Sequence, residues 1–195
     1  KQALIRQLRN LDADLVIVDL DAGAHLNTLD FFLMTPRNGV LVITPERTSI
    51  DNAFKFLRAA LFRRIERFYQ SPEVALLLKR NQNLNEFLDK VRGMASISEE
   101  ARQTLCREML ALAHSIRPHI VVNKANNAYE AKIAANILSK FAREHLHIAP
   151  ELLGFLYYDR HVSEAVNSGV PFIVSKPRRK VSHCVVEMAN RLGYF

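Results

Sequence analysis

The sequence predicts an α/β protein with a mostly parallel sheet. Four short runs are apolar and mostly β-branched, which is typical of strands buried on both faces: residues 15–18, 40–43, 120–122 and 152–156. Longer segments with apolar residues at helical spacing lie between or after these runs. Strands that alternate with helices favour a parallel sheet covered by helices on both faces. We therefore expect one domain over residues 1–195 with a three-layer α/β/α architecture.

The first half of the chain predicts three helices around two of these strands. Residues 2–9 and 27–34 fit short helices. Thr44-Pro45 ends the strand at 40–43, and Thr48 or Ser49 can then cap a long helix. The apolar stripe of that helix should face the sheet: Leu57, Leu61, Ile65 and Phe68.

The middle of the chain, from about residue 71 to 117, contains no convincing strand. Its leucine-rich stretches predict two or three short helices, separated by Gly93 and by the serines of residues 96–98. The segment is too short to form a large core of its own. We interpret it as a helical insertion on the α/β domain.

The last third resumes the alternating pattern. Residues 128–144 predict a helix, Asp159 opens a second one, and Gly169 ends it. Residues 172–174 read as a short edge segment, and Pro177 leads into a final helix that ends near residue 192. The inner face expected for the first of these helices is Ile133, Ala134, Ile137, Leu138 and Phe141.

Composition excludes several classes of protein. The chain is 49% hydrophobic and 24% charged, as ordinary globular proteins are. Cys106 and Cys184 are too far apart to indicate a paired metal site or a disulfide framework, and they fit a reducing cytoplasm. No apolar run reaches membrane-spanning length. The net charge of +7 permits contact with nucleic acid, anionic lipid or phosphate without choosing among them.

Known catalytic motifs are also missing from the sequence. There is no Gly-x-Ser-x-Gly elbow and no Gly-x-Gly-x-x-Gly fingerprint, which argues against a serine hydrolase and a dinucleotide oxidoreductase. The phosphate-binding loop Gly-x-x-x-x-Gly-Lys-Ser/Thr is absent as well. Nucleotide hydrolysis therefore cannot be completed by these 195 residues alone.

The stretch Asp14–Gly23 carries the clearest chemical signal. Asp19 follows the predicted strand 15–18, and α/β sheets place ligands outside the carboxyl ends of their strands. A carboxylate there suits a hydrated magnesium ion, and Gly23 permits a close backbone approach. The alternative is that Asp19 and Asp21 merely cap the next turn.

Three stretches together resemble the MinD/ParA-type (deviant Walker) family of P-loop ATPases, most closely its FlhG (FleN) and Mrp-like branch. Residues 14–23 with 27–32 are similar to its magnesium-side switch, and residues 42–50 to its Thr-Pro-Glu-x-Thr-Ser turn. Residues 153–159 begin a C-terminal pattern that continues through Val162, Ala165-Val166, Pro171-Phe172 and Pro177. The resemblance implies a P-loop NTPase-type sheet and covers most of the chain except the helical insertion.

The resemblance also implies the residues of a site for ATP and magnesium. Asp19 matches the acidic residue that holds magnesium through water, and Gly23 matches the switch glycine that senses the γ-phosphate. Asn123 matches the asparagine that reads the adenine edge, although alone it would read as a residue in a turn. Asp21 departs from the glycine usual in the FlhG branch and adds negative charge beside the switch.

The function implied is that of an ATPase whose ATP-bound form makes a homodimer and whose hydrolysis releases a protein partner. Such a protein would control cell positioning or flagellar number, in the cytoplasm or at the membrane through its partner. One alternative is a nucleotide-free interaction module of the same fold, and another is a DNA-associated partition-type protein. Because the family's phosphate loop is missing, we expect a longer parent, and the reading frame upstream of Lys1 would discriminate the first two interpretations.

Two further expectations concern surfaces. In the family the phosphate-loop strand lies beside the strand that corresponds to residues 15–18, so a chain without it should expose an apolar sheet edge. Arg178, Arg179 and Lys180 should lie in the first turn of the last helix, where cations are unfavourable unless they bind an anion or are screened by solvent.

Overall fold

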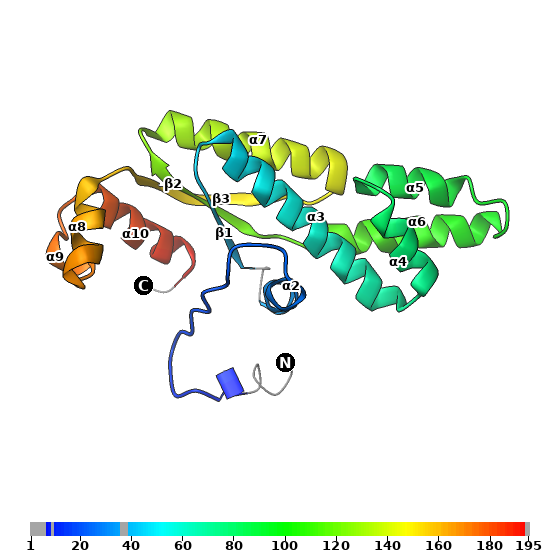
Figure 1. The fold of residues 1–195 in the computed structure, drawn as a ribbon, viewed down its shortest axis with the longest axis horizontal. Coiled ribbons are helices and arrows are strands. Elements are labelled where there is room, and N and C mark those ends of the chain that lie inside the picture. Colours follow the sequence, from blue (N-terminus) through cyan, green and yellow to red (C-terminus); the bar gives the residue numbers. More distant parts are fainter. Residues whose placement is uncertain (1–6, 9, 36–38, 194–195) are drawn as a thin grey trace.

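The computed structural model describes residues 7–8, 10–35 and 39–193. It confirms an α/β fold with a parallel sheet, shown in Figure 1. The strands of this sheet, in spatial order, are β1 (Val40–Ile43), β2 (His119–Ala125) and β3 (Glu151–Tyr157). Both pairings are parallel, so the carboxyl ends of all three strands lie at one edge.

Helices cover both faces of the sheet. α3 (Arg47–Tyr69) and α7 (Ala128–Leu146) pack on one face, where Ile120 and Val122 join the main core. The intervening Val121 points to the other face and packs against Leu153 and against Met188 of α10 (Lys180–Arg191). Figure 1 shows α10 alongside β3, on the side away from α7. The alternation of side chains along β2 therefore produces the layered arrangement.

Helix α2 (Leu26–Met34) confirms the helix predicted at 27–34 and is held on α3 by charge and by aromatic packing. The buried carboxylate of Asp30 accepts hydrogen bonds from Arg63 Nε at 2.9 Å and from Arg67 Nη1 at 3.4 Å. Phe32 packs edge-on against Phe56 of α3, with ring centroids 4.9 Å apart.

The middle of the chain forms α4 (Pro72–Lys79), α5 (Leu84–Arg92) and α6 (Glu99–His114). Each begins with a side-chain cap, supplied by Ser71, Asn83 and Ser98 respectively. The helices predicted in this segment are thus confirmed. α4 and α6 pack against α3, and α5 packs against α6 and α7 (Figure 1).

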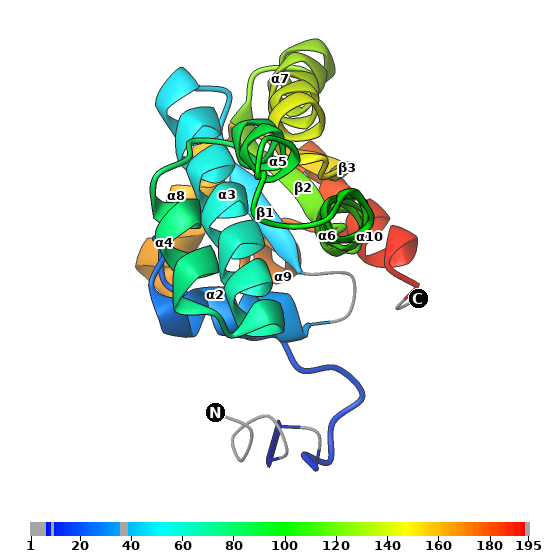
Figure 2. The same cartoon turned by 90° about the vertical axis from the view of Figure 1, so that its right-hand side faces the viewer.

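Residues 15–18 do not form the predicted strand. The segment from residue 15 to 20 has no regular structure, and all four apolar side chains are exposed, Ile17 by 83%. In Figures 1 and 2 most of it runs outside the packed body. A strand needs a neighbour for its backbone donors and acceptors. Among the described residues no strand pairs with this segment. Its β-branched composition alone is therefore not enough to make it a strand.

The long helix α3 starts differently from the prediction. Its N-cap is Glu46, not Thr48 or Ser49, because Ser49 Oγ instead accepts a hydrogen bond from the backbone N–H of Thr44 at 2.9 Å. Leu57, Leu61 and Ile65 are buried as expected, whereas Phe68 at the end of the stripe is exposed.

The C-terminal third is partly as predicted. α8 (Arg160–Ser168) is capped by Asp159 and ends at Gly169, whose φ of +69° favours glycine. Residues 172–174 are not an edge segment but belong to a short helix, α9 (Phe172–Ser175). The last helix begins at Lys180, three residues after Pro177.

The predicted inner face of α7 is only partly correct, and the predicted N-terminal helix is largely outside the described residues. On α7 the buried face is made largely of alanines, and Ile133, Ile137 and Phe141, predicted to face inward, are exposed by about two fifths or more. The helix predicted at residues 2–9 lies mostly outside the described residues. Of the helices described, none combines the length and apolar composition needed to cross a bilayer.

Candidate functional site

The carboxyl edge of the sheet gathers polar residues from three separate strands. Residues 44–46 follow β1, residues 123–127 end β2, and residues 159–161 follow β3. Since the strands are parallel, these segments lie at the same edge. Ligands of open α/β sheets bind outside this edge, which makes it the candidate site.

The end of β1 is electrostatically linked to the end of β2. A hydrogen bond from the Thr44 side chain lowers the pKa of Glu46, and the charge of Lys124 lowers it further to a smaller extent. Glu46 therefore senses the charge of Lys124 on the neighbouring strand. Both side chains are exposed and open to a ligand.

At the end of β2 the backbone is unusual. Lys124 has φ +57°, a left-handed conformation that costs a side-chain-bearing residue about 1 kcal/mol. The half-buried Asn123 beside it accepts a hydrogen bond through Oδ1 from the Lys124 N–H at 2.9 Å. Within the part of the chain that the structure describes, its Nδ2 group has no acceptor. Strained backbone of this kind concentrates at functional sites.

Other polar side chains at the end of β2 satisfy one another. Asn127 caps α7 by accepting from the Glu130 N–H at 2.9 Å, and Glu130 in turn accepts from the Asn126 N–H at 2.6 Å. This reciprocal arrangement is a capping interaction. Asn126 Nδ2 donates to Glu130 at 3.2 Å, whereas the Nδ2 groups of Asn123 and Asn127 have no acceptor among the described residues. Of these two asparagines, Asn123 lies on β2 itself and Asn127 caps α7.

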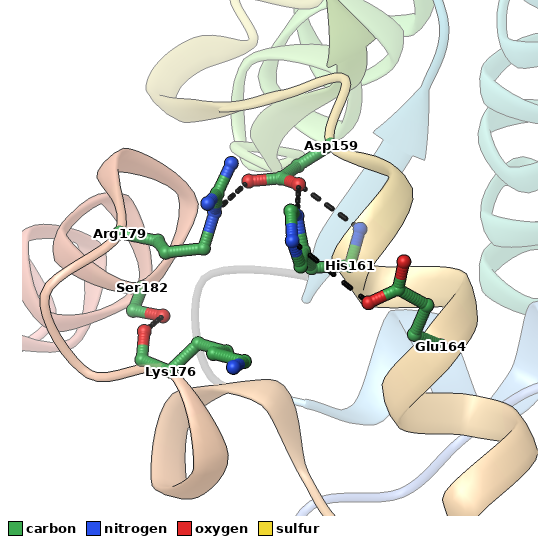
Figure 3. Close-up of polar contacts among 6 residues, drawn as sticks. All are labelled: Asp159, His161, Glu164, Lys176, Arg179 and Ser182. Carbon is green, nitrogen blue, oxygen red and sulfur yellow. Dashed lines mark hydrogen bonds and ion pairs between the residues drawn. The ribbon is translucent and has the colours of Figure 1, made fainter.

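At the end of β3, Asp159 is the centre of a charged cluster drawn in Figure 3. Its Oδ1 accepts from the His161 N–H at 3.0 Å and lies 2.8 Å from His161 Nδ1. Its Oδ2 accepts from Arg179 Nε at 2.6 Å. Glu164 lies on the far side of the imidazole, 3.8 Å from Nε2. The cluster joins the start of α8 to the start of α10.

The cations 178–180 do not behave as one anion-binding group. Arg179 is the N-cap of α10 and is already paired with Asp159, and Lys180 lies over the ring of Tyr157, 5.8 Å from its centroid. Arg178 is exposed and has no partner among the residues that the structure describes. The carboxylate of Asp159 therefore pairs with one of the three cations, Arg179, which was predicted to bind an external anion.

The residues predicted from the sequence fall into two places. Asn123 lies on β2 at the carboxyl edge. Asp19 and Gly23 lie in the segment before α2, outside the sheet, and both are exposed. Gly23 has φ +123°, which only glycine adopts readily. Asp19 does not follow a strand, because residues 15–18 do not form one.

Sequence reasoning missed the backbone strain at Lys124 and the Asp159–His161–Arg179 cluster. Asp159 was visible as a helix start, but Arg179 is twenty positions away and only tertiary packing brings it near. Nothing local marks Lys124. In the described ranges, no group of three or more His, Cys, Asp or Glu side chains forms a metal cage.

Acid should weaken the fold through Asp159. Hydrogen bonds from Arg179 and from the His161 N–H hold the pKa of Asp159 well below its unfolded value of about 3.9. The stabilisation is therefore complete above about pH 4 and is lost as the pH falls towards the folded pKa. Urea unfolding at several pH values should show Arg179→Ala costing about 1 kcal/mol at pH 7 and progressively less below pH 4.

Arg178→Ala is the matched control for this prediction. It removes the neighbouring exposed cation, so the free energy of unfolding should barely change at any pH. Equal effects of the two substitutions, or an effect of Arg179→Ala that is independent of pH, would contradict the assigned contact.

Comparisons with known proteins add no relatives to this description. A scan against protein-family models gives no match, and a search of curated proteins gives none either.

Proposed function

We propose that residues 1–195 are the C-terminal portion of a MinD/ParA/FlhG-like ATPase, which binds ATP with magnesium and uses hydrolysis to switch dimerisation and partner binding. The observation that carries the proposal is the carboxyl edge. The Thr-Pro-Glu turn follows β1, Asn123 lies near the end of β2, and Asp159 follows β3. The resembling family has these motifs in the same order along its sequence. The sheet thus brings motifs far apart in the sequence to one edge.

Asn123 would read the adenine edge. Its Nδ2 group carries two N–H donors and has no acceptor among the described residues, so it is available to a base. Its Oδ1 is engaged by the Lys124 N–H, but an amide oxygen has a second lone pair. The strained Lys124 would fix the direction of the Asn123 side chain.

Asp19 and Gly23 would lie on the phosphate side. The carboxylate of Asp19 is exposed and is the oxygen ligand that hydrated magnesium favours. Magnesium would neutralise charge on the phosphate oxygens. Gly23 would let the backbone approach the γ-phosphate. The negative charge of Asp21 beside it is unfavourable for this contact, which is the feature favouring the second candidate, a nucleotide-free interaction module.

The phosphate loop and its lysines would come from outside these residues. Among the described residues β1 pairs only with β2, along one side, and Val42 on β1 is exposed by 64%. We propose that the strand leading into the loop pairs with this open side of β1 and with residues 15–18, which would then become a strand. The same step would bring Asp19 to the same carboxyl edge as Asn123.

The test uses the parent protein, with Asn123→Ala as the variant. Loss of one hydrogen bond to adenine should weaken Mg-ATP binding about threefold to tenfold and leave Mg-GTP binding nearly unchanged. Isothermal titration with both nucleotides measures this. Asn136→Ala, on the exposed surface of α7, is the control and should change neither affinity.

Two outcomes would overturn the proposal. One is a parent with a phosphate loop in which Asn123→Ala leaves ATP affinity unchanged. The other is a parent without such a loop that binds no nucleotide, which would establish the interaction module.

A further inference from the structure

Helix α2 carries a buried carboxylate that the candidate site does not use. Asp30 is only 4% exposed, and it accepts hydrogen bonds from two arginines of α3. Carboxylates are almost never buried this deeply unless they are paired. Asp30 lies in the helix that directly follows the segment of Asp19 and Gly23, so its pairing bears on where that segment lies.

The contact between Asp30 and Arg63 is two-pronged. Arg63 Nε donates to Oδ1 at 2.9 Å, and Arg63 Nη2 donates to Oδ2 at 3.3 Å. From the next turn of α3, Arg67 Nη1 donates to Oδ1 at 3.4 Å. Arg63 also pairs with Glu66, whose carboxylate lies 3.7 Å from Nη1. A planar guanidinium that meets both oxygens of a carboxylate fixes the direction of approach as well as the distance.

Stability alone does not account for this cluster. Burying a carboxylate costs desolvation free energy that its ion pairs roughly offset, and apolar side chains of similar volume often stabilise a fold as well or better. α2 already has such contacts: Leu29 joins the main core, and Phe32 packs against Phe56. Apolar contacts tolerate small shifts, whereas the two-pronged contact permits one arrangement. The cluster therefore determines where α2 lies on α3 more than how strongly it is held.

α2 in turn holds one end of the segment that precedes it. Residues 15–25 form neither helix nor strand. The N-cap of α2, His25, makes no side-chain capping hydrogen bond that would fix the junction locally. Asp19 and Gly23 stand seven and three positions before Leu26, the first residue of α2. A shift of α2 along α3 would therefore move both residues.

α3 links the position of α2 to the carboxyl edge of the sheet. It begins at Arg47, directly after the Thr-Pro-Glu turn, and the Thr44 N–H donates to Ser49 Oγ in its first turn at 2.9 Å. Arg63 is sixteen residues after Arg47, about 24 Å along the helix axis. The cluster is thus too far from the carboxyl edge to touch a ligand there, and it can act on one only through the two helices.

We propose that Asp30 is a positioning residue for the magnesium side of the nucleotide site, and that its two-pronged contact with Arg63 sets where Asp19 and Gly23 lie relative to the carboxyl edge. This role rests on the proposed function, because it requires magnesium at Asp19. In the parent protein the strand at residues 15–18 would hold one end of the segment, and α2 holds the other. Magnesium demands near-ideal octahedral geometry, so a small displacement of a carboxylate weakens its hold on the ion.

The test measures the metal dependence of ATP binding by the parent protein. Isothermal titration with ATP in excess magnesium and in EDTA gives two affinities, and their ratio reports how well the segment holds the metal. Asp30→Leu with Arg63→Met replaces the pair by apolar side chains and should leave the midpoint of thermal unfolding nearly unchanged. The ratio should fall about tenfold, as when the outer support of a metal ligand is removed, while the affinity in EDTA stays the same.

Two further variants separate position from attachment. Arg63→Lys keeps the charge but not the two-pronged geometry, so the ratio should fall although an ion pair with Asp30 can persist. Phe32→Leu is the matched control on the same helix. It removes the aromatic contact with Phe56 and should lower the midpoint of unfolding, while the ratio remains that of the wild type.

The outcomes distinguish this role from a structural one and from failure of the proposed function. If the cluster only stabilised the fold, the ratio would follow the midpoint of unfolding and Phe32→Leu would lower it most. That result, or an unchanged ratio in both Arg63 variants, would overturn the positioning role while magnesium-dependent ATP binding by the wild type left the proposed function standing. A wild-type parent that binds no ATP would overturn both.

Discussion

Leu61→Ala should lower the free energy of unfolding by about 2–5 kcal/mol, the range for truncating a fully buried leucine. Leu61 is 0% exposed and lies in the middle of α3, within the core shared by α2, α6 and α7. Removing its isobutyl group loses transfer free energy and leaves a cavity, since rigid helices on several sides cannot close over it. At this chain length the midpoint of thermal unfolding should fall by roughly 10 °C.

Lys55→Ala on the same helix is the control for Leu61→Ala. Lys55 is exposed, and alanine has at least as high a helix propensity, so stability should remain within about 0.5 kcal/mol. Calorimetry of both variants gives the comparison. A loss below about 1 kcal/mol for Leu61→Ala would mean that α3 does not organise the core as the structure indicates.

Most of the sheet could be predicted because its signals are local. The runs at 40–43, 120–122 and 152–156 all lie within observed strands. Asp159 caps α8 through its side chain, and Gly169 ends the helix in a left-handed backbone conformation. The run at 15–18 has the same composition but no strand. Composition reports how well a residue suits a buried strand, whereas a strand also needs a partner edge.

The buried face of a helix is also hard to predict from local sequence, as α7 shows. The periodicity of α7 predicted an inner face that included Ile133, Ile137 and Phe141. The real inner face is centred on alanines, because close contact with the sheet rewards small residues. A hydrophobicity pattern ranks residues by apolar character and cannot report which neighbours leave room for them.

Some residues of the candidate site are marked by the local sequence, and others come together only through tertiary packing. Asn123 could be placed because it directly follows the apolar run 120–122 that predicts β2. The pairing of Asp159 with Arg179, and the left-handed backbone at Lys124, arise from tertiary packing and leave no local trace in the sequence. Asp19 stays a prediction, since its position relative to Asn123 depends on the strand that residues 15–18 would form.

Residues 1–195 on their own should self-associate at micromolar concentration and above through the open side of β1. Backbone groups along that side have no strand partner among the described residues, and Val40 and Val42 expose apolar surface next to them. Lysine on an exposed edge strand is a common protection against such pairing. Val42→Lys should therefore convert the chain to a monomer, as measured by sedimentation velocity over a concentration series.

Substitutions at Leu41 on β1 and on α7 are the controls that test whether self-association runs through the open side of β1. Leu41 packs against the main core, so Leu41→Lys should unfold the chain instead of protecting it. Ile133→Ser with Ile137→Ser, on α7, should leave association through β1 intact. A wild-type chain that is monodisperse and melts cooperatively at high temperature would contradict the prediction. In a parent whose phosphate-loop strand pairs with β1, Val42 would be covered, and Val42→Lys should destabilise the fold because it buries an unpaired charge.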